Sequence, residues 1–288
     1  MKKIFPTILL LFLLISIFTI PTISEKNVLR TNLEIEKTND KKIILFLLNK
    51  NNYLVEIPVS LKEISIESII NYLKEDNYEN KGKYFGYIPK DTKVLNYQIE
   101  DDILTINFSE EFKNINKKTI PGLVKSLLNI NKFHKVKILV DNNYIEGYEK
   151  ELDSNIAINQ NYEFNNRTDI EKIIVYYLDE DYYVPVTKYV TTNNNKIEVL
   201  IEELKQNVPD NLMSLITSKI NLLNIEEESD TVILEFNDEL IKDEKNKDKI
   251  MKEIANSILE NEDLSSVIFK VEKKIEKIIS KNDKIREK

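Results

Sequence analysis

The stretch Val94–Phe112, VLNYQIEDDILTINFSEEF, occurs twice in this chain of 288 residues. The second copy, Leu223–Leu240, aligns without a gap with the residues from Leu95 onward, and apolar side chains fall on apolar side chains. Identical pairs anchor the match: Asn96 and Asn224, Glu100 and Glu228, Asp102 and Asp230, Phe108 and Phe236, Glu111 and Glu239. Each copy alternates around an acidic turn, which predicts a β-hairpin. The chain is therefore expected to contain an internal duplication.

The segments around the two hairpins repeat in the same order. Strands are expected over 42–48, 53–59 and 136–140 in the first copy, and over 172–178, 182–189 and 267–271 in the second. Helical spacing of apolar residues predicts one helix before each hairpin and one after it. The stripes are Ile66, Ile69, Ile70 and Leu73; Ile120, Leu123, Val124, Leu127 and Leu128; Ile197, Leu200, Ile201 and Leu204; Ile250, Met251, Ile254, Ile258 and Leu259. Each half is thus expected to be an α+β unit, strand-strand-helix-strand-strand-helix-strand, with two helices packed on one sheet.

These elements divide the chain into six segments. We expect a signal peptide or N-terminal membrane anchor over 1–24, a tether over 25–40, a first domain over 41–147, a linker over 148–170, a second domain over 171–272 and a charged tail over 273–288. Ile156, Ile158 and Tyr162 leave open an extra strand in the linker. Ile275, Ile278 and Ile279 have helical spacing, so the tail is expected to be either a terminal helix or disordered.

The N-terminus resembles an export signal. Lys2 and Lys3 precede an apolar run, Ile8–Ile20, and the segment ends in Thr22-Ile23-Ser24. A charged start, an apolar stretch and small polar residues are typical of a signal peptide, but the apolar stretch is also nearly long enough to form an apolar helix that spans a bilayer. Cleaved signal and retained anchor both remain open. In either case the rest of the chain is predicted to lie outside the cytoplasm, because the positive charges precede the apolar run.

Composition argues against several kinds of function. The formal net charge is -8, and Arg30, Arg167 and Arg286 are the only arginines, which argues against nucleic acid as a partner. Cysteine is absent, so disulfides, thiolate metal sites, cysteine nucleophiles and a lipid-modified cysteine are all excluded.

No group of residues forms a convincing site for chemistry. His134 is the only histidine, so neither a typical zinc site nor a Ser-His-Asp triad is indicated. The acids Asp101-Asp102 and Asp179-Glu180-Asp181 are interpreted as turn residues rather than as a carboxylate dyad or cation site. Ser109, Glu110 and Glu111 lack a nearby base and suit a cap or turn. We therefore assign no catalytic, cofactor-binding or metal-ligating residue, and we expect no cofactor.

Two further features bear on partners. Asn166-Arg167-Thr168 has the form of a glycosylation acceptor. Five tyrosines crowd the second opening strand pair, namely Tyr176, Tyr177, Tyr182, Tyr183 and Tyr189. Strand alternation would point some of them outward as a partner-binding surface, whereas cross-strand packing is the alternative.

The duplicated unit resembles the GerMN domain, a family of sporulation and spore germination proteins. The resemblance rests on Leu54–Val59 and its counterpart Tyr182–Val186, on the lead-in Ile88-Pro89-Lys90-Asp91-Thr92-Lys93, on the hairpin end Ile106–Phe112, and on Val136–Val140 running toward Gly147. It covers residues 41–280. The second copy departs from the pattern, because its lead-in Leu215–Lys219 lacks the proline and Asn237 stands in place of Ser109.

The resemblance implies a non-enzymatic, extracytoplasmic module of the cell envelope, similar in fold type to ring-building modules of secretion-like assemblies. Its expected partners are other envelope or sporulation proteins, with self-association as an option, and the membrane through the apolar N-terminal segment. The alternatives are a secreted peptidoglycan-directed hydrolase or ligand-binding protein, and a paralogue that serves general envelope assembly in a lineage without spores. Carboxylates that converge in one deep cleft would favour the hydrolase.

Overall fold

The computed structural model describes residues 40–76, 82–160, 170–191, 195–206, 208–281 and 283. It shows an α+β protein built of two sheet-based repeats, as the duplication predicts. The expected signal peptide or anchor, the tether and the acceptor Asn166-Arg167-Thr168 lie outside the described residues. Among the residues that are described, none of the helices combines the length and the apolar character needed to cross a membrane.

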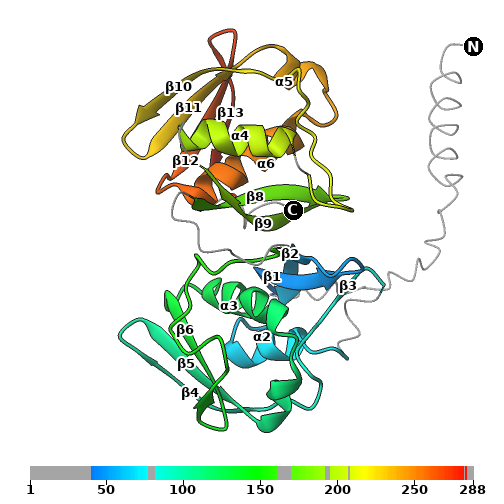
Figure 1. Cartoon of the computed structure of the whole chain (residues 1–288), viewed down its shortest axis with the longest axis vertical. Coiled ribbons are helices and arrows are strands. Elements are labelled where there is room, and N and C mark those ends of the chain that lie inside the picture. The colour runs from blue at the N-terminus through cyan, green and yellow to red at the C-terminus, as the bar shows by residue number, and fades with distance from the viewer. Residues whose placement is uncertain are drawn as a thin grey trace, which may run out of the picture. The chain divides into compact units, whose positions relative to one another are not determined.

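The first repeat contains two sheets and two α-helices (Figure 1). The smaller sheet has the order β2-β1-β3, and the larger one has the order β4-β5-β6-β7. The elements are β1 Lys41–Asn49, β2 Leu54–Leu61, α2 Ile66–Tyr72, β3 Tyr84–Phe85, β4 Val94–Glu100, β5 Ile103–Phe108, the 3-10 helices η2 Glu110–Asn114 and η3 Lys117–Thr119, α3 Ile120–Leu128, β6 Lys135–Val140 and β7 Asn143–Tyr144.

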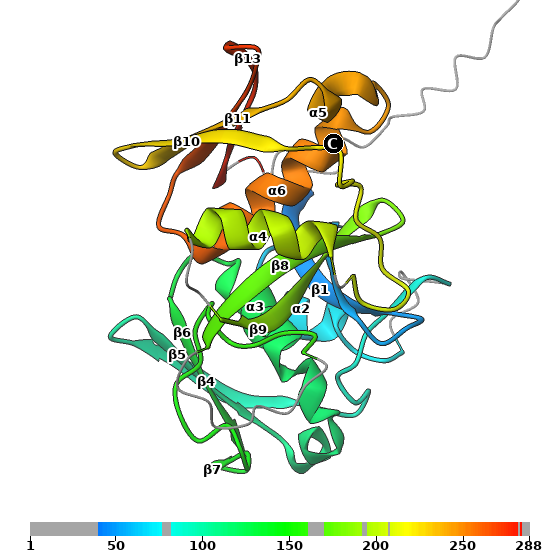
Figure 2. The ribbon, with the colours of Figure 1, turned by 45° about the horizontal axis from the view of Figure 1, so that its top comes forward.

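The second repeat follows the same order. Its smaller sheet is the pair β8-β9, and its larger sheet has the order β10-β11-β12-β13 (Figure 2). The elements are β8 Glu171–Asp179, β9 Tyr182–Val190, α4 Lys196–Lys205, β10 Leu222–Glu228, β11 Thr231–Phe236, α5 Glu239–Lys242, α6 Lys247–Asn261, β12 Ser266–Val271 and β13 Lys274–Ser280. In both larger sheets the two central strands are parallel and the outer strands are antiparallel to them.

The prediction of one sheet per repeat is wrong, because each repeat has two. The helices lie between the smaller and the larger sheet, as Figure 1 shows for α3 and α6. The reason is visible in α3, where every residue from Ile120 to Leu127 is buried. A helix that is buried all round needs a partner layer on more than one side. A single sheet would have left half of that surface in water.

The hairpins that define the duplication form as predicted and close in the same way. Asp101 and Asp102 have φ values of 47° and 68°, so both are left-handed turn residues between β4 and β5. At the far end, the Ser109 hydroxyl accepts from the backbone N–H of Lys93 at 2.9 Å. Asn237 does the same in the second repeat, where its side-chain oxygen accepts from the N–H of Asn221 at 3.0 Å. The replacement of Ser109 by Asn237 therefore keeps the interaction.

Helix side chains pair with backbone groups of β1 and β8 that no neighbouring strand reaches. The Ser126 hydroxyl on α3 accepts from the backbone N–H of Phe46 at 2.9 Å, and Ser257 on α6 accepts from that of Tyr176 at the same distance. Asn261 also donates to the carbonyl oxygen of Ile174 at 2.6 Å. Buried backbone groups that the sheet leaves unpaired need such partners, because leaving them without a hydrogen bond costs about 1–3 kcal/mol each. These bonds fix each helix in register with its sheet.

The segment predicted as a charged tail contains a strand. β13 pairs antiparallel with β12, after a turn in which Glu272 and Lys273 have φ values of 49° and 64°. The helical expectation for Ile275, Ile278 and Ile279 is therefore wrong. Only Ile279 is buried, whereas Ile275 and Ile278 are 58% and 55% exposed. A strand places Ile278 and Ile279 on opposite faces, which a helical stripe would not.

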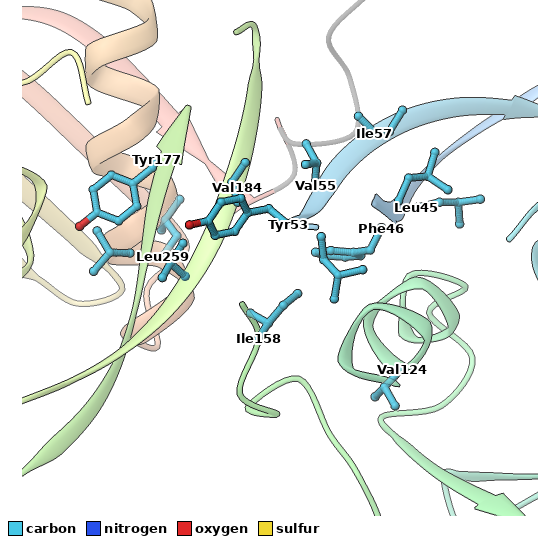
Figure 3. Packing of buried hydrophobic residues seen from close by; sticks show 14 of the residues in the cluster. Leu45, Phe46, Tyr53, Val55, Ile57, Val124, Ile158, Tyr177, Val184 and Leu259 are labelled. Carbon is cyan, nitrogen blue, oxygen red and sulfur yellow. The ribbon is translucent and has the colours of Figure 1, made fainter. Parts of the chain in front are cut away.

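The core runs through both repeats as one apolar cluster. Figure 3 shows side chains of β1, β2 and α3 on one side and of β8, β9 and α6 on the other, with Tyr53 and Ile158 between them. Ile158 belongs to the expected linker and is fully buried. In its described part, 148–160, the linker forms an isolated bridge from Leu152 to Val136 but no strand.

Candidate functional site

The acidic turns do not converge on one site. Asp102 binds the only histidine, with 2.6 Å between its Oδ2 and Nδ1 of His134, but both side chains are largely in water. Asp179 accepts from the side chain of Asn49 at 2.9 Å. Glu180 pairs with Lys83, and Asp181 pairs with Lys249 at 2.6 Å. Each acid of the second turn thus has its own partner, so these residues hold the turn in place.

The serine and acids at the end of the first hairpin also have structural roles. The Ser109 hydroxyl accepts a hydrogen bond from the backbone N–H of Lys93. The hydrogen bond from Ser109 is the main cause that lowers the pKa of the neighbouring Glu111 carboxyl. Glu110 pairs with Lys113 at 3.1 Å in solvent. The Ser109 side chain makes no capping bond to the 3-10 helix η2, so its role is to close the end of the hairpin through Lys93.

The tyrosines of β8 and β9 pack inward or half-inward. Tyr176 and Tyr177 are fully buried, and none of the five is classed as exposed. The Tyr177 hydroxyl donates to the carbonyl oxygen of Glu203 at 2.9 Å, and burial raises its pKa. Tyr182 packs edge-on against Tyr84, with 5.2 Å between ring centroids. Of the two interpretations that the sequence left open for these tyrosines, the structure therefore agrees with packing rather than with an outward aromatic surface.

A buried polar cluster joins the two repeats. Lys125 of α3 lies with its Nζ 2.7 Å from Oε1 of Glu260, and their side chains are only 7% and 18% exposed. The same ammonium group donates to the carbonyl oxygen of Ser154 at 2.7 Å. The Tyr176 hydroxyl lies 2.9 Å from Oε1 of Glu56 and 3.1 Å from Oε2 of Glu260. Burial raises the pKa of this hydroxyl, so it stays protonated and can donate.

Asn159 connects the opening strands of the two repeats. Its side-chain oxygen accepts from the backbone N–H of Leu54 at 2.7 Å. Its amide nitrogen donates to the carbonyl oxygens of Leu54 and Pro185, at 2.8 and 2.7 Å. One residue thus satisfies backbone groups of β2 and β9 at once. Asn159 has a φ of 52°, a conformation that asparagine tolerates better than most residues.

A cleft of about 550 Å³ opens between the repeats, and Glu56 of the buried polar cluster forms part of its lining. Its lining includes apolar residues of β1 and β2, both tyrosines at the start of β9, and a group of charged side chains. The charged residues are Glu56, Asp181, Asp248, Lys249, Lys252, Lys277 and Asp283. Two of the carboxylates are held by lysines, Asp181 by Lys249 and Asp248 by Lys277. Within the described residues, no group of three or more histidine, cysteine or acidic side chains could hold a metal ion.

Glu253 is a buried acid, and the equivalent position in the first repeat is occupied by a different residue. Ser126 and Ser257 make equivalent bonds, so counting back one helical turn places Gly122 opposite Glu253. An added Cβ at Gly122 would lie 2.6 Å from a methyl carbon of Leu54, so the first repeat has no room for a side chain there. In the second repeat Oε2 of Glu253 accepts from the backbone N–H of Leu215, whereas Oε1 has no partner among the described residues.

Replacing Glu253 by glutamine should remove part of the pH dependence of stability. Burial raises the pKa of Glu253 from 4.5 to about 8, so the native state prefers the neutral acid. Its contribution to stability is present below about pH 4.5 and is lost as pH rises through about 8. Across that window the wild type should lose about 4 kcal/mol of unfolding free energy relative to Glu253→Gln, measured by urea denaturation. Glu227→Gln, an exposed control, should track the wild type; parallel curves for all three proteins would contradict the prediction.

Sequence reasoning missed the two buried ionisable residues Lys125 and Glu253. Lys125 is the only charged residue in the helix sequence IPGLVKSLL. Glu253 lies between Ile250 and Ile254 of the apolar stripe of α6. A charged residue within an apolar stripe is the signal that could have marked them. Their partners were beyond reach, because Glu260 lies 135 residues from Lys125.

Comparison with known proteins agrees with the tandem architecture. The family model Germane, described as sporulation and spore germination, matches residues 44–146 and again residues 174–276. This chain belongs to the Germane family. The two matched segments coincide with the two repeats of this Germane protein, so the GerMN resemblance is confirmed.

Two relatives show the same architecture. The spore germination protein GerM of Bacillus subtilis (strain 168) is 30% identical over 276 residues, which covers 84% of this chain and 75% of that protein. A solved structure of the tandem GerMN domains of the sporulation protein GerM from Bacillus subtilis has a TM-score of 0.73 at 23% identity. It covers 84% of this chain and 96% of that one. The solved structure supports the fold, and the family match connects this Germane protein with sporulation and spore germination.

Proposed function

We propose that this Germane protein is a non-enzymatic, extracytoplasmic envelope protein that acts by protein–protein association during sporulation or spore germination. The observation that supports this most is the tandem pair of family repeats, matched over most of the chain. The residues that were candidates for chemistry are consistent with this proposal, because Ser109, Asp181 and Tyr177 all make contacts that stabilise the fold. The N-terminal pattern supplies export, either as a cleaved signal or as a membrane anchor.

Two measurements test this function. In the organism, deletion of the gene should reduce the yield of spores or slow their germination. A reporter enzyme that works only outside the cytoplasm, fused after residue 283, should be active. The fusion would be compared with one whose N-terminal 24 residues are removed, which should be inactive. Normal sporulation and germination in the deletion strain, or equal reporter activity in both fusions, would refute the proposal.

The cleft favours one second candidate, binding or hydrolysis of a small envelope ligand such as a peptidoglycan fragment. Its volume lies within the range of small-molecule sites, and it has apolar walls with a few charged groups. Against hydrolysis, two of its carboxylates are bound by lysine ammonium groups. Calorimetry with soluble muropeptides tests binding, and release of reducing ends from purified walls tests hydrolysis. Heat of binding that disappears in Lys252→Ala would establish a ligand site in the cleft.

A further inference from the structure

The larger sheet of the second repeat ends in two open strands. Its order is β10-β11-β12-β13, and no described strand lies beyond either end. Both terminal strands have seven residues. An edge strand presents backbone N–H and C=O groups that have no partner within the sheet, and it can pair with a strand of another chain. At the very end of β13 the backbone N–H of Ser280 donates to Oδ2 of Asp283 at 2.8 Å. Along the rest of these two edges, no helix side chain of the described residues seals the backbone as Ser126 and Ser257 do in the smaller sheets.

The two edges carry opposite charge. Glu226, Glu227 and Glu228 of β10 are all exposed, and no lysine or arginine occurs between them and the end of β11. The other edge is rich in lysine, with Lys273 and Lys274 exposed at the start of β13 and Lys281 just after it. The acidic edge of one copy should therefore attract the basic edge of a second copy. Two acidic edges, or two basic edges, should repel each other.

Apolar side chains accompany both edges. Leu223 on β10 is 62% exposed, and Ile275 and Ile278 on β13 are 58% and 55% exposed. Ile278 stands in register with Ile268, which is in register with Ile233, so the row crosses the sheet face away from α6. A strand added beside β13 would cover Ile278 and continue this row.

We propose that the β10 edge of one copy pairs with the β13 edge of a second copy, joining the larger sheets of two second repeats. The charges select this arrangement and disfavour the symmetric pairings β10 with β10 and β13 with β13. With the helices of both copies on the same side, the new pair is parallel, because β10 and β13 run in the same direction. Such a contact uses different surfaces on the two partners, so each copy can bind two others. The inference deepens the proposed function and rests on it for its setting in the envelope.

The absence of cysteine makes a direct crosslinking test possible. Glu226→Cys on β10 and Ile278→Cys on β13 point to the same face of the sheet, as their registers with Ile233 and Ile268 show. The protein used starts at residue 40 and contains the whole described core. Mixed under mild oxidation, the two single-cysteine chains should form the mixed disulfide dimer about tenfold more than Gln98→Cys mixed with Ile278→Cys. Gln98 is the matched control, because it aligns with Glu226 on β4 of the first repeat.

Charge reversal separates specific pairing from collision. In the parallel register that brings residues 226 and 278 together, Glu227 and Glu228 lie beside the end of β13, next to Lys281. Adding Glu227→Lys and Glu228→Lys to the β10 chain should reduce the mixed dimer to the control level, as should Lys281→Glu in the β13 chain. The two reversed chains mixed together should regain it, which also shows that both still fold. Equal crosslinking to the Gln98→Cys control, preferred Glu226→Cys self-dimers, or no recovery on double reversal would overturn the inference. Failure here with a clear deletion phenotype would leave the proposed function standing.

Discussion

Truncation of Phe108 to alanine is expected to lower the free energy of unfolding by about 3–5 kcal/mol. Phe108 lies on β5 with no exposed surface, and its ring stacks on that of Phe112 with 4.1 Å between centroids. The change removes a large apolar side chain and leaves a cavity that the packed layers around it cannot close. Guanidinium denaturation of the chain from residue 40 onward measures the effect, with the transition midpoint and slope compared between variants.

The chain offers a matched control for this change. Phe85 is the same residue type on the short strand β3 but is 45% exposed, so Phe85→Ala should cost less than about 1 kcal/mol. Phe236 occupies the equivalent place in the second repeat, is fully buried and packs near Phe269. Phe236→Ala should therefore resemble Phe108→Ala. A loss under about 1 kcal/mol at Phe108 would show that the ridge of β5 is not the centre of the core.

The features of this fold that could be predicted from the sequence were those with a local periodic pattern, namely the strands and turns of the hairpins. The alternation in the hairpins placed Leu104, Ile106 and Phe108 on one face, and all three are fully buried. The acidic turns were assignable for a similar reason, because Asp101 and Asp102 tolerate positive φ better than most residues. Periodicity is a local property, and a single sequence carries it in full.

The layers and the joint between the repeats were not predictable in this way. Division of each repeat into two sheets depends on which strands pair, and β1 pairs with β2 and β3 but with no strand of the larger sheet. A docking surface stayed open for the tyrosines of β8 and β9 because their partners come from other parts of the chain, such as Glu56, which accepts from the Tyr176 hydroxyl. Asn159, in a segment without periodicity, gave no signal at all. These features depend on contacts between residues far apart in the sequence, which local patterns do not reveal.

That long-range joint leads to the second large effect. Lys125→Met should lower the free energy of unfolding by about 3–5 kcal/mol at neutral pH, because it leaves the Glu260 carboxylate buried without its cation. Lys125 and Glu260 belong to different repeats, and their 2.7 Å contact is almost closed to water. Urea denaturation followed by far-ultraviolet and tyrosine signals measures the loss. Because the contact joins the repeats, the two signals should also separate if the repeats begin to unfold independently.

Two comparisons give this prediction its meaning. Lys113→Met breaks an ion pair with Glu110 in which both side chains are more than half exposed, so it should cost less than about 1 kcal/mol. Adding Glu260→Gln to Lys125→Met should restore about half or more of the loss, because the neutral amide needs no counter-charge while Glu56 still accepts from Tyr176. If Lys125→Met cost no more than Lys113→Met, water would reach the cluster, and the joint between the repeats would rest on apolar contacts and on other polar contacts such as those of Asn159 and Asn49. If instead the double variant were no more stable than the single, the ammonium group of Lys125 would matter through its bond to Ser154 rather than through its charge.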